Sequence, residues 1–552
     1  MISTKEWSAL PDLFTPHRLR LLLALIGNGL VQVGAMAGIA FLIRAMIDGV
    51  RSAEPFSPGW IVAAILLANL LLGVFKWHEM IAAQRLGEDY AMDMRQNAFH
   101  HLSTLSVHAQ SSLRGGSLQL RFVNDLTAIR SWISNGLARL IISATISFGA
   151  IAALWFMEPM LAGVLSVVIL VAVSGALVIG RSFDEKIRMA RKRRGQIAAN
   201  ISEKITNMPV IQAFAHLNLE RRKLKRQSRR LADAQVGKAA VTGVFRGFMI
   251  FVVGSGIALM VLAASWSAGP QGPDVGSLVS AIGLFSLVSP NLFRLGKVYE
   301  YWKSSRIAQE KLARLFDLGP SIESAPDPKK PRKRFAGVRL HNVSVGDALK
   351  KINCEIGPTD RVVLKGGNGA GKTTLLNLIL RLIEPDKGQV QLSGKDIRGI
   401  RTGDLRRQIS IISPSLGVMK GTVATNIAYG SSKADADAVA LAASRCGMEA
   451  HNPDSPFYLD RPVKEGGRNL SAGERMRVIM ARALVASPKM LLLDEPETHL
   501  DAESLKILIE LLEGYEGAWL ATSHSDTLDD IATRHWVLRQ GTMSETSGAM
   551  AA

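Results

Sequence analysis

Six long, uncharged and mainly apolar segments alternate with charged segments over the first 300 residues. They are Leu21–Ile43, Trp60–Phe75, Leu140–Met157, Met160–Gly180, Gly247–Gly269 and Val275–Phe293. A helix that spans a bilayer needs about 20 residues at about 1.5 Å per residue. Four of the segments have 19 residues or more, and the second, with 16, borrows residues near Lys76, whose long side chain can reach the interface. The pattern predicts six membrane-spanning helices rather than buried helices of a soluble protein.

The basic residues gather in two of the connecting segments. Arg181–Lys238 holds 16 Lys and Arg and Lys76–Arg139 holds seven, whereas the connections after the third and fifth spans hold none. Basic loops stay on the cytoplasmic side of a membrane, so we expect both long loops and both termini in the cytoplasm, in an inner-membrane, multi-pass protein. This asymmetry explains most of the net charge of +19 without nucleic acid as a partner.

The composition agrees with a membrane protein. Apolar residues make up 48% of the chain, only 20% of residues are charged and the mean hydropathy is +0.17, which excludes a disordered chain. The two cysteines, Cys354 and Cys446, allow neither a disulfide scaffold nor a cysteine-based zinc site, and they indicate a reducing compartment. No cleavable signal is predicted, because the first apolar run is too long for one.

The long basic loop predicts helices rather than a plain connector. Arg181–Lys238 contains good helix formers and few breakers besides Pro209. Two antiparallel helices of about 28 residues would each extend the spans by about 42 Å into the cytoplasm. After this membrane domain, residues 1–316, a Pro-rich and basic linker is predicted at 317–335, and a soluble domain at 336–552.

A glycine-rich motif begins the chemistry of the second half. The stretch DRVVLKGGNGAGKTT, 360–374, combines a short apolar strand, a glycine turn and a helix that begins near Lys372, and it fits the P-loop pattern G-x-x-x-x-G-K-[ST]. Backbone N–H groups and the helix N-terminus favour phosphate, Lys372 supplies a charge to the β- and γ-phosphates, and the Thr373 hydroxyl suits Mg²⁺. The predicted ATP-binding residues of this loop are Gly366, Gly367, Asn368, Gly369, Ala370, Gly371, Lys372, Thr373 and Thr374.

Two acids follow a second predicted strand. KMLLLDEP, 489–496, is a buried strand that ends at Asp494 and Glu495. With the glycine loop at the same sheet edge, Asp494 is placed to hold Mg²⁺ and Glu495 to polarise the attacking water. Mg²⁺ is therefore predicted to have Thr373 and Asp494 as its protein ligands.

Three further segments carry candidate residues. NLSAGER, 469–475, opens a helix with Ser471 as N-cap, and Gly473 lets a phosphate approach the backbone. ETHLD ends at Asp501, and the strand Ala518–Thr522 leads to His524. Taken alone, NLSAGER is more simply a capped helix, and a lone histidine is more often structural than catalytic. His524, however, follows a strand at the edge where the γ-phosphate is expected.

Together these motifs resemble an ATP-binding cassette in order and spacing. The whole chain resembles a half-transporter of the ABC exporters of type I, with six spans fused ahead of one nucleotide-binding domain. Segments 115–137 and 205–220 are similar to intracellular-loop stretches of that family. The resemblance implies short coupling helices near Val107–Leu113 and Gln212–Glu220. The expected fold is thus an all-α polytopic membrane domain with six transmembrane helices and long cytoplasmic extensions, followed by an α/β P-loop domain.

The resemblance also implies roles and a partner. In that family two cassettes enclose two ATP molecules, so Ser471 and Gly473 would contact the γ-phosphate held by the other copy's glycine loop. Asp501 would lie at the subunit seam, and His524 would contact the γ-phosphate. Lys372, Glu495 and His524 are the expected catalytic residues. A second half-transporter is required, and the retained Glu495 favours a homodimer, because impaired sites in heterodimers of the family usually lack that glutamate.

Two positions depart from the family pattern. NVSVGDALKKI, 342–352, lacks the aromatic residue that normally stacks on adenine, and Ser413 and Pro414 stand where a glutamine is expected after the strand Ile409–Ile412. That glutamine normally reaches Mg²⁺ and transmits the nucleotide state to the membrane domain. Weaker ATP binding and altered coupling follow as expectations.

The sequence predicts ATP-driven export or flipping of a substrate across the cytoplasmic membrane. A specialised subunit of a heterodimeric transporter, and a membrane-tethered cassette ATPase acting on nucleic acid or ribosomes, remain alternatives. The substrate is unknown. Four arginines that flank or enter spans suggest an anionic or amphipathic cargo, although positive-inside bias also explains them; they are Arg44, Arg139, Arg246 and Arg294.

Overall fold

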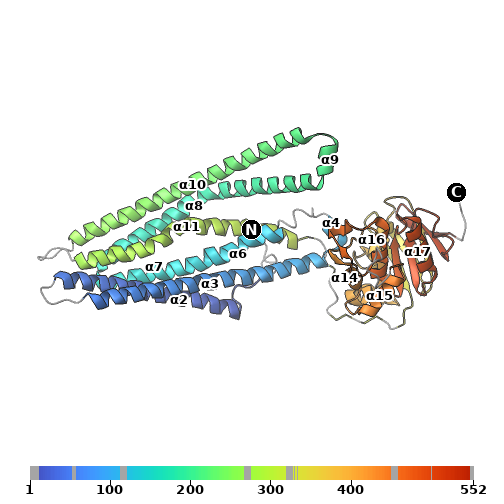
Figure 1. The fold of residues 1–552 in the computed structure, drawn as a ribbon, viewed down its shortest axis with the longest axis horizontal. Coiled ribbons are helices and arrows are strands. Elements are labelled where there is room, and N and C mark those ends of the chain that lie inside the picture. Colours follow the sequence, from blue (N-terminus) through green and yellow to red (C-terminus); the bar gives the residue numbers. More distant parts are fainter. Residues whose placement is uncertain are drawn as a thin grey trace. The chain divides into compact units, whose positions relative to one another are not determined.

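The chain forms two compact units. The computed structural model describes residues 11–51, 58–111, 121–266, 275–318, 322, 327–328, 330–331, 334–448, 458–498 and 500–546. One unit comprises Met1–Ser103 and Ser112–Leu318, and the other comprises Thr104–Ser111 and Gly319–Ala552. The first is helical and the second is α/β (Figure 1). Most of the predicted linker 317–335 lies outside the described residues.

Long helices build the first unit. They are α2 (Pro16–Arg51), α3 (Gly59–Thr104), α7 (Ala138–Met157), α8 (Pro159–Thr206), α10 (Leu217–Trp266) and α11 (Val275–Phe316). Within the described residues, six helical stretches are long and apolar enough to cross a membrane, and each contains all or most of one predicted span. The prediction of six spans is confirmed. Even the shortest predicted span belongs to a long helix, because α3 continues without a break past Lys76.

The third span has an irregular beginning that the hydrophobic pattern does not reveal. Helix α6 (Leu126–Trp132) lies between two π-helical turns, η1 (Arg121–Asp125) and η2 (Ile133–Leu137), and then continues into α7. Such wider turns change which side chains face a neighbouring helix. Asn135 of η2 and Arg139 of α7 both border a cavity.

Helices α8 and α10 extend the membrane spans as two antiparallel rods (Figure 1). α8 continues past Gly180 because no glycine pair or proline interrupts it before Pro209. At the tip Lys204 and Lys223 each donate to Glu220, at 2.5 and 2.7 Å between nitrogen and carboxylate oxygen. The predicted helical extensions are confirmed.

The short helix at the tip lies earlier than expected. α9 spans Met208–Ala213, whereas the prediction was Gln212–Glu220, of which most belongs to the first turn of α10 and the turn before it. Pro209 occupies the first turn of α9, where a missing N–H costs nothing. Ala215, in the turn between α9 and α10, has a positive φ of 55°, so the backbone is not helical there and α10 begins only at Leu217. The boundary prediction was wrong by several residues.

The other predicted coupling helix belongs to the second unit. α4 (Val107–Ser111) begins where expected, and residues 112–113 lie outside the described residues. The backbone N–H of Val107 donates to the carbonyl oxygen of Leu382 at 3.1 Å. Its side chain packs against the apolar cluster that also holds Leu380 and Ile383. This short helix is therefore docked on the α/β domain.

Two main sheets form the α/β domain. β2 (Leu349–Ile356), β1 (Val338–Val345), β4 (Lys387–Leu392) and β5 (Lys395–Asp396) form an antiparallel sheet in that order. The larger sheet has the order β12 (Thr542–Thr546), β11 (Arg534–Arg539), β3 (Arg361–Lys365), β10 (Ala518–Thr522), β9 (Met490–Asp494) and β6 (Ile409–Ile412), and all its pairs except β11–β12 are parallel.

Among the described residues, six further α-helices complete the α/β domain: α12 (Lys372–Ile379), α13 (Thr402–Gln408), α14 (Val423–Ala428), α15 (Ala436–Ser444), α16 (Ala472–Leu484) and α17 (Ala502–Glu513). α12, α13 and α16 contact strands of the larger sheet, whereas α14 and α15 pack on α16. β7 (Gly421–Thr422) and β8 (Pro462–Val463) form a separate antiparallel pair. Alternate residues of β9 belong to two different apolar clusters, Leu491 and Leu493 to one and Met490 and Leu492 to the other. Burial on both faces explains why the strand is a continuous apolar run.

Candidate nucleotide site

The carboxyl ends of three parallel strands meet at one edge of the larger sheet. Thr522 of β10 is paired with Leu364 of β3 on one side and with Asp494 of β9 on the other. The glycine loop, the two acids and His524 all follow these strand ends directly. This register brings together the segments that the sequence analysis combined.

The glycine loop connects β3 to α12. Gly369 and Gly371 have φ values of +76° and +107°, which glycine adopts without strain. A Cβ atom on Gly371 would lie 2.5 Å from the carbonyl oxygen of Ala348, so no side chain fits there. The loop leads into the N-terminus of α12, where unpaired backbone N–H groups and the helix dipole favour an anion.

The ammonium group of Lys372 lies at the centre of the site although the side chain is only 5% exposed. Its Nζ donates to the carbonyl oxygen of Gly366 at 2.8 Å. It also lies 2.9 Å from Nε2 of His524 and 3.6 Å from Oε1 of Glu495. All three predicted catalytic side chains are thus within contact of one another.

His524 has two incompatible neighbours. The same Nε2 atom lies 2.9 Å from Lys372 Nζ, which can only donate, and 2.9 Å from Glu495 Oε1, which accepts as a carboxylate. One nitrogen cannot accept from the first and donate to the second at once. Lys372 and Glu495 therefore compete for the same nitrogen of His524. A phosphate group that binds Lys372, and a water molecule that binds Glu495, would relieve this competition.

The backbone holds Glu495 in an unusual conformation. Its φ is +49°, which a residue other than glycine seldom adopts. The N–H of Glu495 donates to the carbonyl oxygen of Thr522 at 3.1 Å and to its Oγ1 at 3.0 Å. β10 therefore fixes the direction in which the carboxylate leaves the sheet.

Thr373 and Asp494 form an oxygen-rich pair. Oγ1 of Thr373 lies 3.2 Å from Oδ1 of Asp494, which also accepts from Oγ1 of Thr522 at 3.1 Å. Burial raises the pKa of Asp494, and the hydrogen bonds from Thr522 and Thr373 oppose that rise. A hydroxyl and one carboxylate suit Mg²⁺, which prefers oxygen ligands and usually takes the rest from phosphates and water. Within the described residues no cluster of three His, Cys, Asp or Glu offers an all-protein metal site.

Sequence reasoning missed two residues that support this site. Thr522 is fully buried and contacts both acids, and Glu497 accepts from Ser523 Oγ at 2.5 Å and from the His524 N–H at 3.3 Å. Glu497 thereby holds the turn that carries His524. The only available signals were the polar residue at the end of an apolar strand and the third acid in DEPE.

Ser471, Gly473 and Asp501 form a separate group. Oγ of Ser471 accepts from the Glu474 N–H at 3.1 Å, and the Ser471 N–H donates to Glu474, which completes a capping box on α16. A Cβ atom on Gly473 would lie 2.5 Å from Ser504 Oγ and 3.1 Å from Asp501 Oδ2. The close approach of α17 thus requires glycine here.

Asp501 is the N-cap of α17. Its Oδ1 accepts from the Ser504 N–H at 2.8 Å, and hydrogen bonding from the Ser504 side chain, together with this backbone bond, lowers the pKa of Asp501. Among the described residues no hydrogen bond or ion pair joins this group to the residues around Lys372. The structure of one chain brings together the glycine loop, Asp494, Glu495 and His524, and it leaves Ser471, Gly473 and Asp501 apart from them.

The two departures from the expected pattern have clear positions. β6 pairs with β9 through Ile412 and Leu493, so Ser413 follows β6 beside Asp494. The buried Ser413 hydroxyl is paired with that of Ser415 at 2.8 Å. The turn between β1 and β2, residues 346–348, presents no aromatic ring.

Two family models match this chain. Residues 21–292 match the model of the ABC transporter transmembrane region, and residues 349–498 match the model described as ABC transporter. The chain belongs to the ABC transporter family. In this ABC transporter the matched regions contain the six spans and the residues of the nucleotide site up to Thr498.

Relatives with known names support this assignment along nearly the whole chain. An ATP-dependent lipid A-core flippase of Syntrophus aciditrophicus is 25% identical over 505 residues, covering 90% of this chain and 84% of the relative. An ABC multidrug transporter of Aspergillus fumigatus is 25% identical over 553 residues, covering 92% and 69%. A solved structure of a bacterial Atm1-family ABC exporter with ATP bound matches the fold with a TM-score of 0.83 at 22% identity, covering 95% of this chain and 94% of that one.

The transporter is therefore a multi-pass membrane protein that couples ATP hydrolysis to transport. Its half-transporter organisation, one membrane domain and one cassette, means that it functions as a dimer. The predicted family, fold class and ATP-driven transport activity are confirmed.

Proposed function

We propose that two copies of this chain form an ATP-driven exporter or flippase of the cytoplasmic membrane, with the cassette and both termini in the cytoplasm. The basic extensions of α8 and α10 support this orientation, because such segments are not translocated. Amphipathic cargo is supported by relatives named as a lipid A-core flippase and a multidrug transporter.

In this proposal the glycine loop, Gly366 to Gly371, and the start of α12 hold the phosphates of ATP. Lys372 exchanges its contacts with Glu495 and His524 for oxygens of the β- and γ-phosphates, and Thr374 adds its first-turn N–H group. Thr373 and Asp494 would hold Mg²⁺, which neutralises charge on the phosphates when bound. Their 3.2 Å separation supports this pairing.

Glu495 then acts on the attacking water. Its carboxylate orients the water and accepts a proton as the oxygen attacks the γ-phosphorus, while the bond to the bridging oxygen of ADP breaks. His524 exchanges its Nε2 contact with Glu495 for a hydrogen bond that it donates to a γ-phosphate oxygen. The observation that carries the proposal is the contact of Glu495 with both His524, at 2.9 Å, and Lys372, at 3.6 Å.

The second copy completes each site. Oγ of Ser471 already accepts a hydrogen bond in its cap, and its own hydrogen is free to donate to a γ-phosphate oxygen. The Gly473 N–H lies in the first turn of α16, which favours an anion. Asp501 caps α17 beside this turn and would lie at the subunit seam. The separation of this group from Lys372 within one chain supports an assembly in which the two groups meet between copies.

A homodimer is favoured over a heterodimer. Each chain retains the full set of Lys372, Asp494, Glu495 and His524, so two identical copies would form two complete hydrolytic sites. Ser413 and Pro414 would then occur in both sites, and coupling would depend on α4 and α9. A specialised role in a heterodimer is the alternative, and it predicts hydrolysis only with a different half-transporter.

Glu495→Gln tests the catalytic assignment. The amide keeps the shape and the contact with His524 but does not accept a proton, and loss of a general base costs about 10²–10⁴-fold in rate. Purified Glu495→Gln protein should bind Mg²⁺-ATP like the wild type and hydrolyse it at no more than about 1% of the wild-type rate. Hydrolysis within a factor of a few of the wild type would remove Glu495 from the mechanism.

A further inference from the structure

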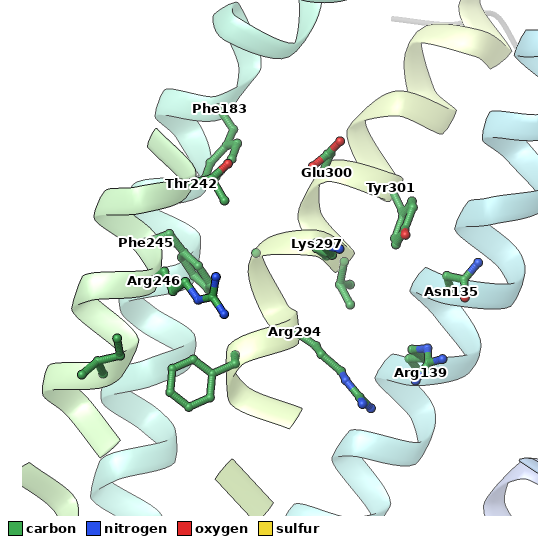
Figure 2. Close-up of a pocket in the computed structure, with 14 residues that line it drawn as sticks. Asn135, Arg139, Phe183, Thr242, Phe245, Arg246, Arg294, Lys297, Glu300 and Tyr301 are labelled. Carbon is green, nitrogen blue, oxygen red and sulfur yellow. The ribbon is translucent and has the colours of Figure 1, made fainter. Parts of the chain in front are cut away.

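A cavity of about 650 Å³ opens among the membrane helices. Residues from η2, α7, α8, α10 and α11 line it (Figure 2). This volume lies within the range of sites that take small molecules. It belongs to the helical unit and is separate from the nucleotide site.

The cavity is strongly cationic. Four of its lining residues carry a positive charge, and they come from three helices: Arg139 from α7, Arg246 from α10, and Arg294 and Lys297 from α11. Figure 2 shows Arg294 extending from α11 toward the helix of Arg139, and Arg246 extending from α10 toward α11.

The acids near the cavity do not neutralise it. Glu300 is the single acid of the lining, and its carboxylate is paired with Lys238 at 2.5 Å. Across the part of the chain that the structure describes, no side chain forms an ion pair with the four cations. Like charges held together at the edge of a bilayer repel one another, and an anion between them removes that repulsion.

The depth of these cations follows from the sequence. Arg139 and Arg246 come directly before the apolar segments that begin at Leu140 and Gly247, and Arg294 comes directly after the one that ends at Phe293. All three therefore lie where a span meets the basic, cytoplasmic side. This is the level of the lipid headgroups in the inner leaflet.

Positive-inside bias accounts for cations at this level but not for their direction. Arginines that only snorkel extend their charged ends to water or bulk headgroups, which does not require a shared cavity. Arg44 shows a different arrangement, since it lies 3.8 Å from Asp48 on its own helix. Convergence of three helices on one cavity is the feature that a binding site requires.

The cavity also has an apolar wall that continues into the membrane. Phe183 and Phe245 are buried in this wall, and Phe293 and Ile250 extend it along the spans. A Cβ atom on Gly296 would lie 2.6 Å from the Phe245 ring, so glycine lets that ring lie against α11. The site thus combines a cationic end at the membrane surface with an aromatic and aliphatic side toward the membrane interior.

We propose that this cavity binds the phosphate-bearing head of an anionic amphiphile that enters from the inner leaflet, with its acyl part along the aromatic wall. Guanidinium groups bind phosphate oxygens in pairs, and several of them suit a head of more than one negative charge. The inference rests on the proposed export function and names the class of cargo.

Binding of a phosphatidic acid with a fluorescent acyl chain tests this proposal. The full-length protein in neutral detergent is titrated, and fluorescence anisotropy gives the apparent Kd. Arg246→Gln combined with Arg294→Gln should raise that Kd about tenfold or more, because two charge-assisted contacts are lost. Arg181→Gln is the matched control, since Arg181 also follows a span directly but does not line the cavity, and it should change the Kd less than about twofold.

Two competitors separate the possible sources of the anion. A phosphatidylcholine with the same chains should bind at least about tenfold more weakly, because its head has no net charge. Glycerol 3-phosphate should not displace the fluorescent lipid at similar concentration, because it lacks the apolar part. Equal binding of the neutral lipid, or displacement by glycerol 3-phosphate, would overturn the assignment of an anionic amphiphile.

Separate control experiments test whether the variants fold and whether the proposed function holds. Both arginine side chains are exposed, and Arg246→Lys with Arg294→Lys keeps the charge and should retain most of the binding, so a loss seen only with glutamine reports charge. If the double glutamine variant does not elute as the wild type, Arg294→Gln alone replaces it. Equal Kd values for the cavity variant and Arg181→Gln would sink the cavity assignment even if the wild type hydrolyses ATP, whereas absence of ATP hydrolysis would sink the proposed function whatever the lipid binding.

Discussion

Removal of one buried hydroxyl should weaken the use of Mg²⁺ by this protein. Thr522 is fully buried, and its Oγ1 donates to Asp494 Oδ1 at 3.1 Å. Thr522→Val keeps the shape of the side chain and replaces this donor with a methyl group. The Glu495 N–H retains the Thr522 carbonyl oxygen at 3.1 Å, so the loss is concentrated on Asp494.

The magnitude follows from the charge of the acceptor. A hydrogen bond to a charged group contributes about 1.5–3 kcal/mol, and about 1.4 kcal/mol corresponds to a factor of ten. The apparent affinity for Mg²⁺ in ATP hydrolysis should therefore fall about tenfold or more. Burial already raises the pKa of Asp494, and the bond from Thr522 lowers it. Without that bond the pKa rises further, so activity that needs the carboxylate should be lost at a higher pH as the solution is acidified.

The assay is ATP hydrolysis measured against free Mg²⁺ at fixed ATP and repeated across the acidic pH range. Thr522→Ser keeps the hydroxyl, so its dependence on free Mg²⁺ and on pH should match that of the wild type. If Thr522→Val folds and shows the wild-type Mg²⁺ dependence and acid limb, the hydrogen bond has no role in positioning Asp494, and this reasoning is refuted.

Two further predictions concern the dimer and the membrane topology. Gly473→Ala places a methyl group 2.5 Å from Ser504 Oγ in a helix contact, so it should abolish ATP hydrolysis while ATP still binds to the glycine loop, and wild-type turnover would contradict the role of this turn. Cysteines introduced at Arg193 or Ser432 should react with an impermeant reagent only from the cytoplasm, and one at Ser52, outside the described residues, only from the other side. Burial raises the pKa of Cys354 and Cys446 to about 12, so the native thiols label slowly, and labelling of Ser52→Cys from the cytoplasm would disprove the six-span topology.

Features that depend on one local pattern could be predicted from the sequence. Uncharged runs of about 20 residues have few structural solutions, and the strand–glycine loop–helix order of 360–374 places Lys372 at a helix start without further information. The strands ending at Asp494 and Thr522 were predictable for the same reason, since runs buried on both faces belong to a parallel sheet.

Features that depend on register or on several helices could not be predicted in this way. Thr522 meets Asp494, and Glu497 meets Ser523, only because β9 and β10 align. A threonine at the end of a strand has many ordinary explanations. The boundary of α9 was missed because a proline can begin a helix as well as end one. The convergence of Arg139, Arg246 and Arg294 required the packing of α7, α10 and α11, which one sequence does not specify.

The central claim is that this chain alone forms a working dimer. The purified chain, with no other half-transporter present, is cross-linked in lipid and its ATP hydrolysis is measured beside Glu495→Gln. We predict a cross-linked dimer with measurable hydrolysis that the Glu495→Gln variant lacks. A stable monomer that hydrolyses ATP only after a second, different half-transporter is added would contradict it.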